Sequence, residues 1–233
     1  MPQRPAVLSL VLLAGWLAPV SLQAQRAGQT VDEGTFVISR NGAVIGRESF
    51  RIVRSPSASG DVFRATAQLA LGDQRVVPSL SADSTGAPLS YDVAVQNGPD
   101  RQVRLQGRAR PGRFSAMLRT RDGESTKEYV VPSSAVVLDD DISHQLYFVT
   151  LSGRRAGPVS VLDPRSNAQI TANLERRGEA TVEIGGTAVP AQHYVLTAPG
   201  IPRREFWVDD GGRVLKVTVP DRGIIALRDE PPR

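Results

Sequence analysis

The chain has 233 residues and a formal net charge of +4, and 40% of its residues are hydrophobic against 22% charged. This composition fits one globular domain better than a disordered or fibrous chain. The sequence contains no cysteine, which excludes disulfides, thiolate metal ligands and cysteine nucleophiles. Its two histidines, His144 and His193, are too few for a multi-histidine centre, so we expect no metal and no cofactor.

Residues 1–24 have the pattern of a secretory signal peptide. Arg4 gives a positive start, residues 6–22 are apolar, and Ala24 places a small residue before the expected cut. This apolar stretch is at the low end of the length needed to span a bilayer. We therefore expect cleavage after Ala24, export to the periplasm or the extracellular medium, and no transmembrane anchor in the product. Residues 25–233 are expected to form a single β-rich domain.

Turn signals recur at short intervals in the first half of the chain, among them Asn41-Gly42, Asn97-Gly98 and Asp122-Gly123. Between them lie runs in which apolar and polar residues alternate, which is typical of antiparallel strands joined by hairpins. The alternation gives each strand one covered face and one wet face. The covered positions are Phe63, Ala65, Ala67, Leu69 and Leu71 in one run, and Leu89, Tyr91, Val93 and Val95 in the next.

The pattern changes to a helical one after Asp139-Asp140-Asp141. Ile142, Leu146 and Val149 are spaced i, i+4, i+7 and Gly153 follows as a stop, which predicts a helix at about 141–152. Asp141 is the expected N-cap, and the other two aspartates favour the positive end of the helix.

Strand patterns return beyond the helix and end in a hairpin whose turn is Asp209-Asp210-Gly211-Gly212. The sequence therefore predicts a mostly β fold. We expect a curved antiparallel sheet or half-barrel, with the one helix against its concave face.

Three segments taken together carry a resemblance: GTFVISRNGAVIG at 34–46, GGTAVPAQHYVL at 185–196 and FWVDDGGRVLKV at 206–217. In this order they resemble exported bacterial proteins of a domain family of unknown function. Those proteins are similar in shape to the LolA/LolB type of periplasmic lipoprotein carriers. The resemblance implies a half-barrel with a helix in its mouth and carries no catalytic residue.

Arginines concentrate between residues 101 and 121. In an extended strand Arg104, Arg108 and Arg110 share one face. This face is either an ordinary solvated surface or a dock for an anionic partner such as a lipid headgroup or an envelope polymer. We expect no nucleic acid, because no aromatic side chains alternate with the arginines to stack bases.

Three aromatic residues are candidate ligand contacts. If Trp207 faces the concave side of the sheet, it joins Tyr147 and Tyr194 as the lining of a pocket. The alternative is that the three side chains pack in the core.

Catalysis has little support in the sequence. Ser143 and His144 are neighbours near the three aspartates, but adjacent residues on a helix do not face each other, and no Gly-x-Ser-x-Gly motif occurs. Three consecutive aspartates also lack the alternate spacing of a calcium loop. We therefore expect no catalytic residue and no metal site.

These observations favour an exported, non-catalytic protein that binds a lipid or another amphipathic ligand between sheet and helix. The alternative is an envelope scaffold or protein-interaction module with a filled core, and a hydrolase using His144 or His193 comes third. A carrier requires a cavity on the order of several hundred cubic ångströms, whereas a scaffold requires a solid core.

Overall fold

One sheet of 15 strands makes up the fold, in the order β8-β7-β6-β5-β4-β3-β2-β1-β15-β14-β13-β12-β11-β10-β9. The computed structural model describes residues 28–98 and 101–233, so the predicted signal peptide at 1–24 lies outside the described residues. Strands β1–β8 form one meander and β10–β15 form a second, and the two meanders join where β1 pairs with β15. The neighbouring strands are antiparallel except β9 and β10, which are parallel.

The first meander consists of β1 (Gln29–Arg40), β2 (Ala43–Ser57), β3 (Gly60–Leu71), β4 (Gln74–Asp83), β5 (Pro88–Asn97), β6 (Arg101–Arg110), β7 (Arg113–Thr120) and β8 (Gly123–Val130). The remaining strands are β9 (Val136–Val137), β10 (Gly157–Asp163), β11 (Ala168–Ile184), β12 (Thr187–Ala198), β13 (Ile201–Val208), β14 (Val214–Val219) and β15 (Ile224–Arg228). The helical turns are η1 (His144–Leu146), α1 (Tyr147–Thr150) and η2 (Pro220–Arg222). None of the helices in residues 28–98 and 101–233 is long and apolar enough to cross a membrane.

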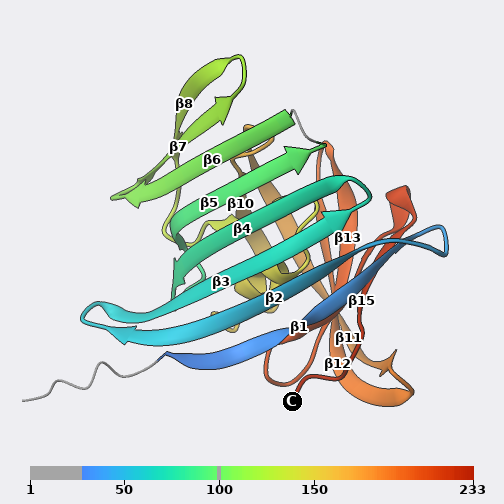
Figure 1. The fold of residues 1–233 in the computed structure, drawn as a ribbon. Coiled ribbons are helices and arrows are strands. Elements are labelled where there is room, and N and C mark those ends of the chain that lie inside the picture. Colours follow the sequence, from blue (N-terminus) through green and yellow to red (C-terminus); the bar gives the residue numbers. More distant parts are fainter. Residues whose placement is uncertain (1–27, 99–100) are drawn as a thin grey trace, which may run out of the picture.

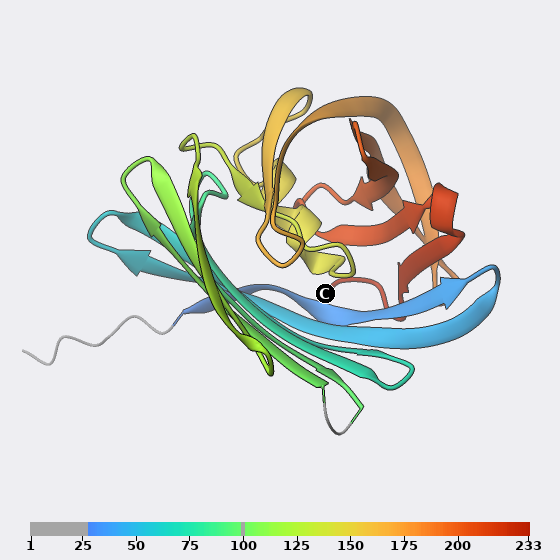
Figure 2. The same ribbon diagram turned by 90° about the horizontal axis from the view of Figure 1, so that it is seen from above.

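The sheet is strongly curved, and its two meanders bend around the helical segment between β9 and β10 (Figures 1 and 2). It does not close into a barrel, because β8 and β9 remain as its two edges. The predicted mostly β fold with a curved antiparallel sheet is therefore confirmed.

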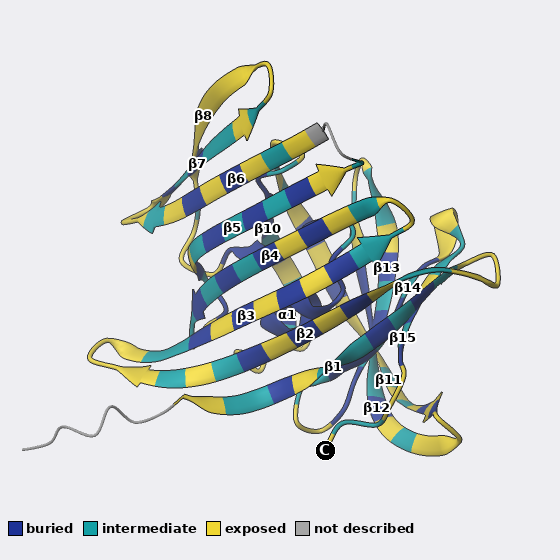
Figure 3. Ribbon diagram, viewed as in Figure 1, coloured by how far each residue is buried: buried dark blue, intermediate teal, exposed yellow. Residues whose placement is uncertain are grey.

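Burial alternates along the strands of the first meander, as the sequence predicts (Figure 3). In β3, Phe63, Ala65, Ala67 and Leu69 are buried on the concave side and the residues between them are exposed. The prediction for Leu89 is wrong. A bulge pairs Ser81 with Ser90 but Ala82 with Pro88, so Leu89 is the extra residue and is 40% exposed.

The helix is shorter than predicted. Helical structure runs from His144 to Thr150 rather than over 141–152, and its first half is a 3₁₀ turn. Neither η1 nor α1 has a side-chain N-cap, so the prediction of Asp141 as N-cap is wrong. Gly153 does end the segment, since its φ is 74° and its N–H donates to the carbonyl of Thr150.

A glycine on β2 permits a close approach to the neighbouring strand. Gly46 lies beside a bulge in β2, where Ile38 pairs with Gly46 but Ser39 pairs with Val44. A Cβ atom added at Gly46 would lie 2.0 Å from the backbone oxygen of Ala70 on β3. Because this obstacle is backbone and cannot rotate away, only glycine fits here.

We expect Gly46→Ala to lower the free energy of unfolding by about 2–3 kcal/mol, because β2 and β3 must separate locally to admit the methyl group. Urea denaturation followed by circular dichroism measures this loss. Gln68→Ala, on the exposed side of β3, is the control and should change stability by about 0.5 kcal/mol or less. Equal midpoints for the two variants would contradict the close approach.

Candidate functional site

A buried carboxylate on β2 holds the helical segment against the sheet. Glu48 lies on the concave face of β2 and is 0% exposed. Its Oε2 accepts a hydrogen bond from the backbone N–H of Ser143 at 2.8 Å, and its Oε1 accepts one from the N–H of His144 at 3.1 Å. The first N–H groups of a helical segment have no partner within it. Glu48 therefore supplies, from another strand, the cap that the sequence pattern assigned to Asp141.

The imidazole of His144 belongs to the same contact. Its Nδ1 lies 2.6 Å from Oε1 of Glu48, and its ring stacks on Phe50 with centroids 5.6 Å apart. His144 is 1% exposed, and its Nε2 has no hydrogen-bond partner among the described residues. The histidine thus packs as a core side chain tied to the capping carboxylate.

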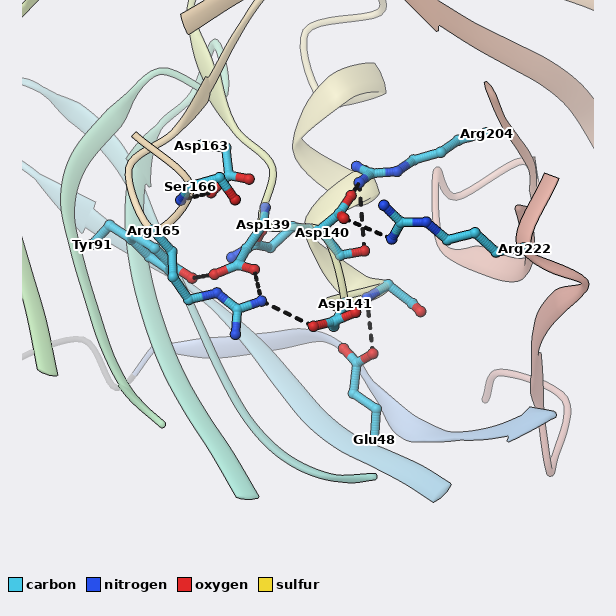
Figure 4. A network of polar contacts seen from close by, with 12 residues as sticks. Glu48, Tyr91, Asp139, Asp140, Asp141, Asp163, Arg165, Ser166, Arg204 and Arg222 are labelled. Atoms are coloured by element: carbon cyan, nitrogen blue, oxygen red, sulfur yellow. Dashed lines mark hydrogen bonds and ion pairs between the residues drawn. The ribbon is translucent and has the colours of Figure 1, made fainter. Parts of the chain in front are cut away.

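The carboxylates of the three consecutive aspartates contact arginine side chains and a tyrosine hydroxyl that come from distant elements (Figure 4). Asp139 accepts a hydrogen bond from the hydroxyl of Tyr91 on β5 at 2.7 Å and forms an ion pair with Arg165, from the β10–β11 turn. Arg165 also contacts Asp141 at 3.1 Å. Because Tyr91 lies in the first meander and Arg165 in the second, these contacts join the aspartate run to both meanders.

Asp140 makes a second set of ion pairs on the other side. It pairs with Arg204 on β13, and one of its carboxylate oxygens lies 2.6 Å from Nη1 of Arg222 in η2. Arg204 is only 7% exposed, so its contact with Asp140 is partly shielded from solvent. We call the contacts of Glu48, Asp139, Asp140 and Asp141 the interior network.

The two meanders leave Asp139 and Asp140 in different electrostatic surroundings. Burial raises the pKa of Asp139, and the opposing charge of Arg165 does not fully offset it. Burial also raises the pKa of Tyr91 well above its ordinary value, so the phenol stays protonated and donates to Asp139. For Asp140, burial acts in the same direction but Arg222 and Arg204 outweigh it, and the net pKa is lowered.

The space beside the interior network is small. A pocket of about 50 Å³ lies between Asp140, Arg204, Arg222 and the apolar side chains of β1, β2, β14 and β15. Sites for drug-sized ligands range from about 300 to 1,000 Å³. Across residues 28–98 and 101–233, no group of three or more histidine, cysteine, aspartate or glutamate side chains could hold a metal ion.

Comparison with known proteins places the chain in a family. Residues 95–226, more than half of the chain, match the model described as "Domain of unknown function (DUF6134)". The chain belongs to the DUF6134 family. No curated protein matches it.

The fold of this DUF6134 chain is similar to a solved structure, the crystal structure of a "Beta-barrel-like Protein of Domain of Unknown Function DUF1849 from Brucella abortus". The TM-score is 0.55 at 11% sequence identity, and the match covers 87% of this chain and 97% of the other. The likeness shows a common fold. The DUF6134 match contains the three aspartates and their arginine partners, whereas Glu48 and Tyr91 precede the matched residues.

The predicted aromatic lining is divided between the two faces of the sheet. Tyr147 on α1 packs against Phe63, and burial raises its pKa to about 12. Tyr194 is also buried on the concave side, where it stacks on Phe206.

Trp207 points to the opposite face from Phe206, so the structure does not bring it together with Tyr147 and Tyr194. Its ring stacks on His193 with centroids 4.3 Å apart, and Nζ of Lys216 lies 4.8 Å from its centroid. His193 in turn lies 2.9 Å from a carboxylate oxygen of Glu205. Among the described residues, neither His193 nor His144 is hydrogen-bonded to a serine or threonine hydroxyl.

The predicted arginine face exists, but carboxylates are interspersed on it. Arg104, Arg108 and Arg110 are all exposed on the outer side of β6. Arg108 forms an ion pair with Asp92 at 2.8 Å. Arg104 lies directly opposite Arg119, and Arg110 lies opposite Arg113. These two cross-strand partners bind carboxylates of β8, Arg119 to Glu124 and Arg113 to Glu128, each at 2.6 Å. The face is therefore mixed in charge.

Sequence reasoning missed Glu48, Arg165 and Arg204. A signal for Glu48 was present, because it occupies the same alternate positions as Phe50 and Ile52, and a carboxylate on an apolar face requires a partner. No comparable signal marked the two arginines, since the chain contains many.

We expect Glu48→Gln to lower the free energy of unfolding by about 2–4 kcal/mol, because an amide cannot accept all three hydrogen bonds and removes the buried charge. Chemical denaturation at neutral pH measures the loss. Glu128→Gln is the control. It removes an exposed ion pair with Arg113 and should cost about 0.5 kcal/mol or less. A Glu48→Gln variant as stable as the control would show that the cap does not hold the segment.

The lowered pKa of Asp140 predicts a pH-dependent contribution to stability. Because the carboxyl titrates below its unfolded value, its stabilisation is fully present above about pH 4 and is lost as the pH falls through the folded pKa. We expect Asp140→Asn to cost about 2–3 kcal/mol at pH 7 and progressively less below pH 4. Denaturation curves of the wild-type protein and of the Asp140→Asn variant between pH 7 and the acid range below pH 4 test this prediction. The control is Asp122→Asn, which lies at an exposed turn. A cost that does not change with pH would contradict the assignment.

Proposed function

We propose that this protein is an exported, non-catalytic interaction module whose interior is filled, so that it works through its outer surface. The observation that carries the proposal is the packing of residues 138–150 into the concave side of the sheet. This segment is almost entirely buried, and its polar groups bind Glu48, Tyr91, Arg165 and Arg204 rather than facing an open cavity.

The alternative is the carriage of a lipid inside the curved sheet. An acyl chain gains about 0.8 kcal/mol for each CH₂ that it buries, and it needs apolar room to do so. The pocket beside the interior network has a volume of about 50 Å³ and is rimmed by Asp140, Arg204 and Arg222. Opening more room would require breaking the contacts of Glu48 or of the aspartates, which favours the filled interior.

Two further features support the proposal. Residues 1–24 have the composition of a cleaved export signal. His144 is 1% exposed, and among the described residues its ring is hydrogen-bonded to no serine or threonine hydroxyl, so its geometry is that of a packing residue rather than of a general base open to a substrate.

Native mass spectrometry of the protein purified from its own host tests the proposal, with a known lipid carrier prepared in parallel. We expect the mass of residues 25–233 with no adduct, and no lipid in an organic extract of the sample. A bound lipid in stoichiometric amount would overturn the filled interior and favour the carrier. The mass of the uncleaved chain would overturn export.

A further inference from the structure

A groove of about 470 Å³ opens on the outer side of the first meander, across β2, β3 and β4. Phe50, Ala67 and Pro78 lie at its floor. Their side chains are buried on the concave side of the sheet, so they reach the groove through their backbone atoms. The volume of the groove is within the range of ligand sites. The outward-facing side chains that line it are Ser49, Arg51, Thr66, Gln68, Val77 and Ser79.

Pro78 is an unusual residue for its position, because β4 lies inside the sheet between β3 and β5. Proline has no N–H to give to a ladder, and in sheets it is otherwise found on edge strands or at bulges. The strand register shows the interruption. Thr66 pairs with Ser79 and Leu69 pairs with Val76, but the two positions between them on β3 have no paired residue on β4. The ladder between β3 and β4 is therefore open at Pro78.

The interruption leaves one backbone acceptor of β3 without a donor. The N–H of Gly72 donates to the carbonyl of Ile45 on β2. Backbone groups alternate in direction along a strand, so the odd-numbered residues of β3 turn theirs toward β4. Ala67 is one of them, and by the register on either side it lies opposite Pro78. Since proline has no N–H, the carbonyl of Ala67 receives no hydrogen bond from β4, and an unpaired carbonyl inside a sheet calls for an explanation.

The side chains around this carbonyl are polar. Ser49 and Arg51 bond to threonine hydroxyls of β1. Thr66, Gln68 and Ser79, by contrast, make no side-chain hydrogen bond within the described residues. Hydroxyl and amide groups both donate and accept hydrogen bonds. The groove thus presents short polar groups that match a ligand rich in hydroxyls.

The surroundings of the groove are positively charged. Its lining holds the guanidinium of Arg51 and no carboxylate, and the carboxylate of Glu33 outside the lining is 3.6 Å from that arginine, beyond good hydrogen-bond distance. Arg64 and Arg75 are exposed on the same outer faces of β3 and β4, each two residues from the lining. Among the described residues, neither pairs with a carboxylate. Nη1 of Arg75 donates only to turn carbonyls, so its charge stays uncompensated.

We propose that this groove binds an acidic saccharide, whose carboxylates pair with Arg64 and Arg75 and whose hydroxyls bond to the polar lining and donate to the carbonyl of Ala67. The proposal deepens the proposed function and rests on its view that the protein acts through its outer surface. The unpaired carbonyl requires a donor and the arginines require an acid, and a sugar acid supplies both.

An acidic peptide suits the groove less well than a saccharide. Peptides that bind to sheets commonly extend a free edge strand or place side chains in apolar pockets. Here β3 and β4 each have a neighbouring strand on both sides, so no edge is free. Val77 is the one exposed apolar side chain in the lining, and it forms no pocket for a side chain.

Isothermal titration with tri-galacturonate and with its neutral trimethyl ester tests the charge of the ligand. We expect the acid to bind at least about tenfold more tightly than the ester. Its binding should weaken as salt is added, because the arginines are exposed to solvent. Equal binding of the two probes, or no binding of either at about 10 mM, would overturn the proposal.

Pro78→Val tests the unpaired carbonyl. Valine restores the N–H of β4, which then donates to Ala67, so the acceptor is withdrawn from the groove while its charge stays the same. We expect tri-galacturonate binding to weaken about three- to tenfold, with an unchanged circular dichroism spectrum and a thermal midpoint no lower than that of the wild-type protein. Thr66→Val, which removes one hydroxyl at an exposed position, is a second test and should weaken binding about threefold. Wild-type affinity in Thr66→Val, or in a folded Pro78→Val variant, would overturn the assignment.

The double variant Arg64→Gln, Arg75→Gln tests the position of the charges. It removes the two uncompensated guanidinium groups and should weaken tri-galacturonate binding about tenfold at low salt. Arg110→Gln, exposed on β6 and outside the groove, is the matched control and should leave the affinity unchanged. An equal loss in the control and in the double variant would show a general attraction to a basic chain and would overturn the site.

A peptide probe separates the two classes of acidic partner. Acetylated tri-glutamate amide carries the same three carboxylates on a peptide, and tighter binding of this peptide than of tri-galacturonate would overturn the saccharide. A lipid-free protein that binds no tri-galacturonate overturns this inference and leaves the proposed function standing. A lipid-loaded protein overturns the proposed function, whatever the saccharide result.

Discussion

Glu48 brings a carboxylate into the interior of the sheet, where an unpaired charge would cost several kcal/mol. Two backbone N–H groups and the imidazole of His144 compensate it, and no other segment of the described chain offers donors to this oxygen pair. The need to pair that charge therefore places the helical segment on β2. Once the segment is there, Tyr147 and Phe148 fill the remaining apolar space of the concave face.

The same segment connects two halves of a sheet that does not close. In the described part of the chain, the ladder of backbone hydrogen bonds joins the meanders only where β1 meets β15, and the edges β8 and β9 stay apart in the strand order. Asp139 reaches β5 and the β10–β11 turn, while Asp140 reaches β13 and η2. These ion pairs act across the interior in place of a closed ladder, and their partial burial protects them from screening by salt.

The sequence predicted what depends on local periodicity and missed what depends on distant partners. Alternation assigned Phe63 and Leu69 to the concave face correctly, because strand side chains alternate wherever the ladder is regular. It failed at Leu89, since a bulge shifts the alternation by one residue. The aspartate run resembled a helix cap because its partners are remote. Arg165 is 24 residues from Asp141, and Arg204 is 64 residues from Asp140.

The compensation of buried charge also distinguishes the interior network from Asp32 on β1. In the interior network, both carboxylate oxygens of Glu48 and of Asp139 have hydrogen-bond partners, which is what a structural role requires. Among the described residues, Asp32 holds the one buried carboxylate oxygen without a partner. Arg228, which ends β15 and bridges to Glu33 and Val214, satisfies only half of that group. Burial raises the pKa of Asp32 despite the charge of Arg228, as expected for a carboxylate with one oxygen left without a donor.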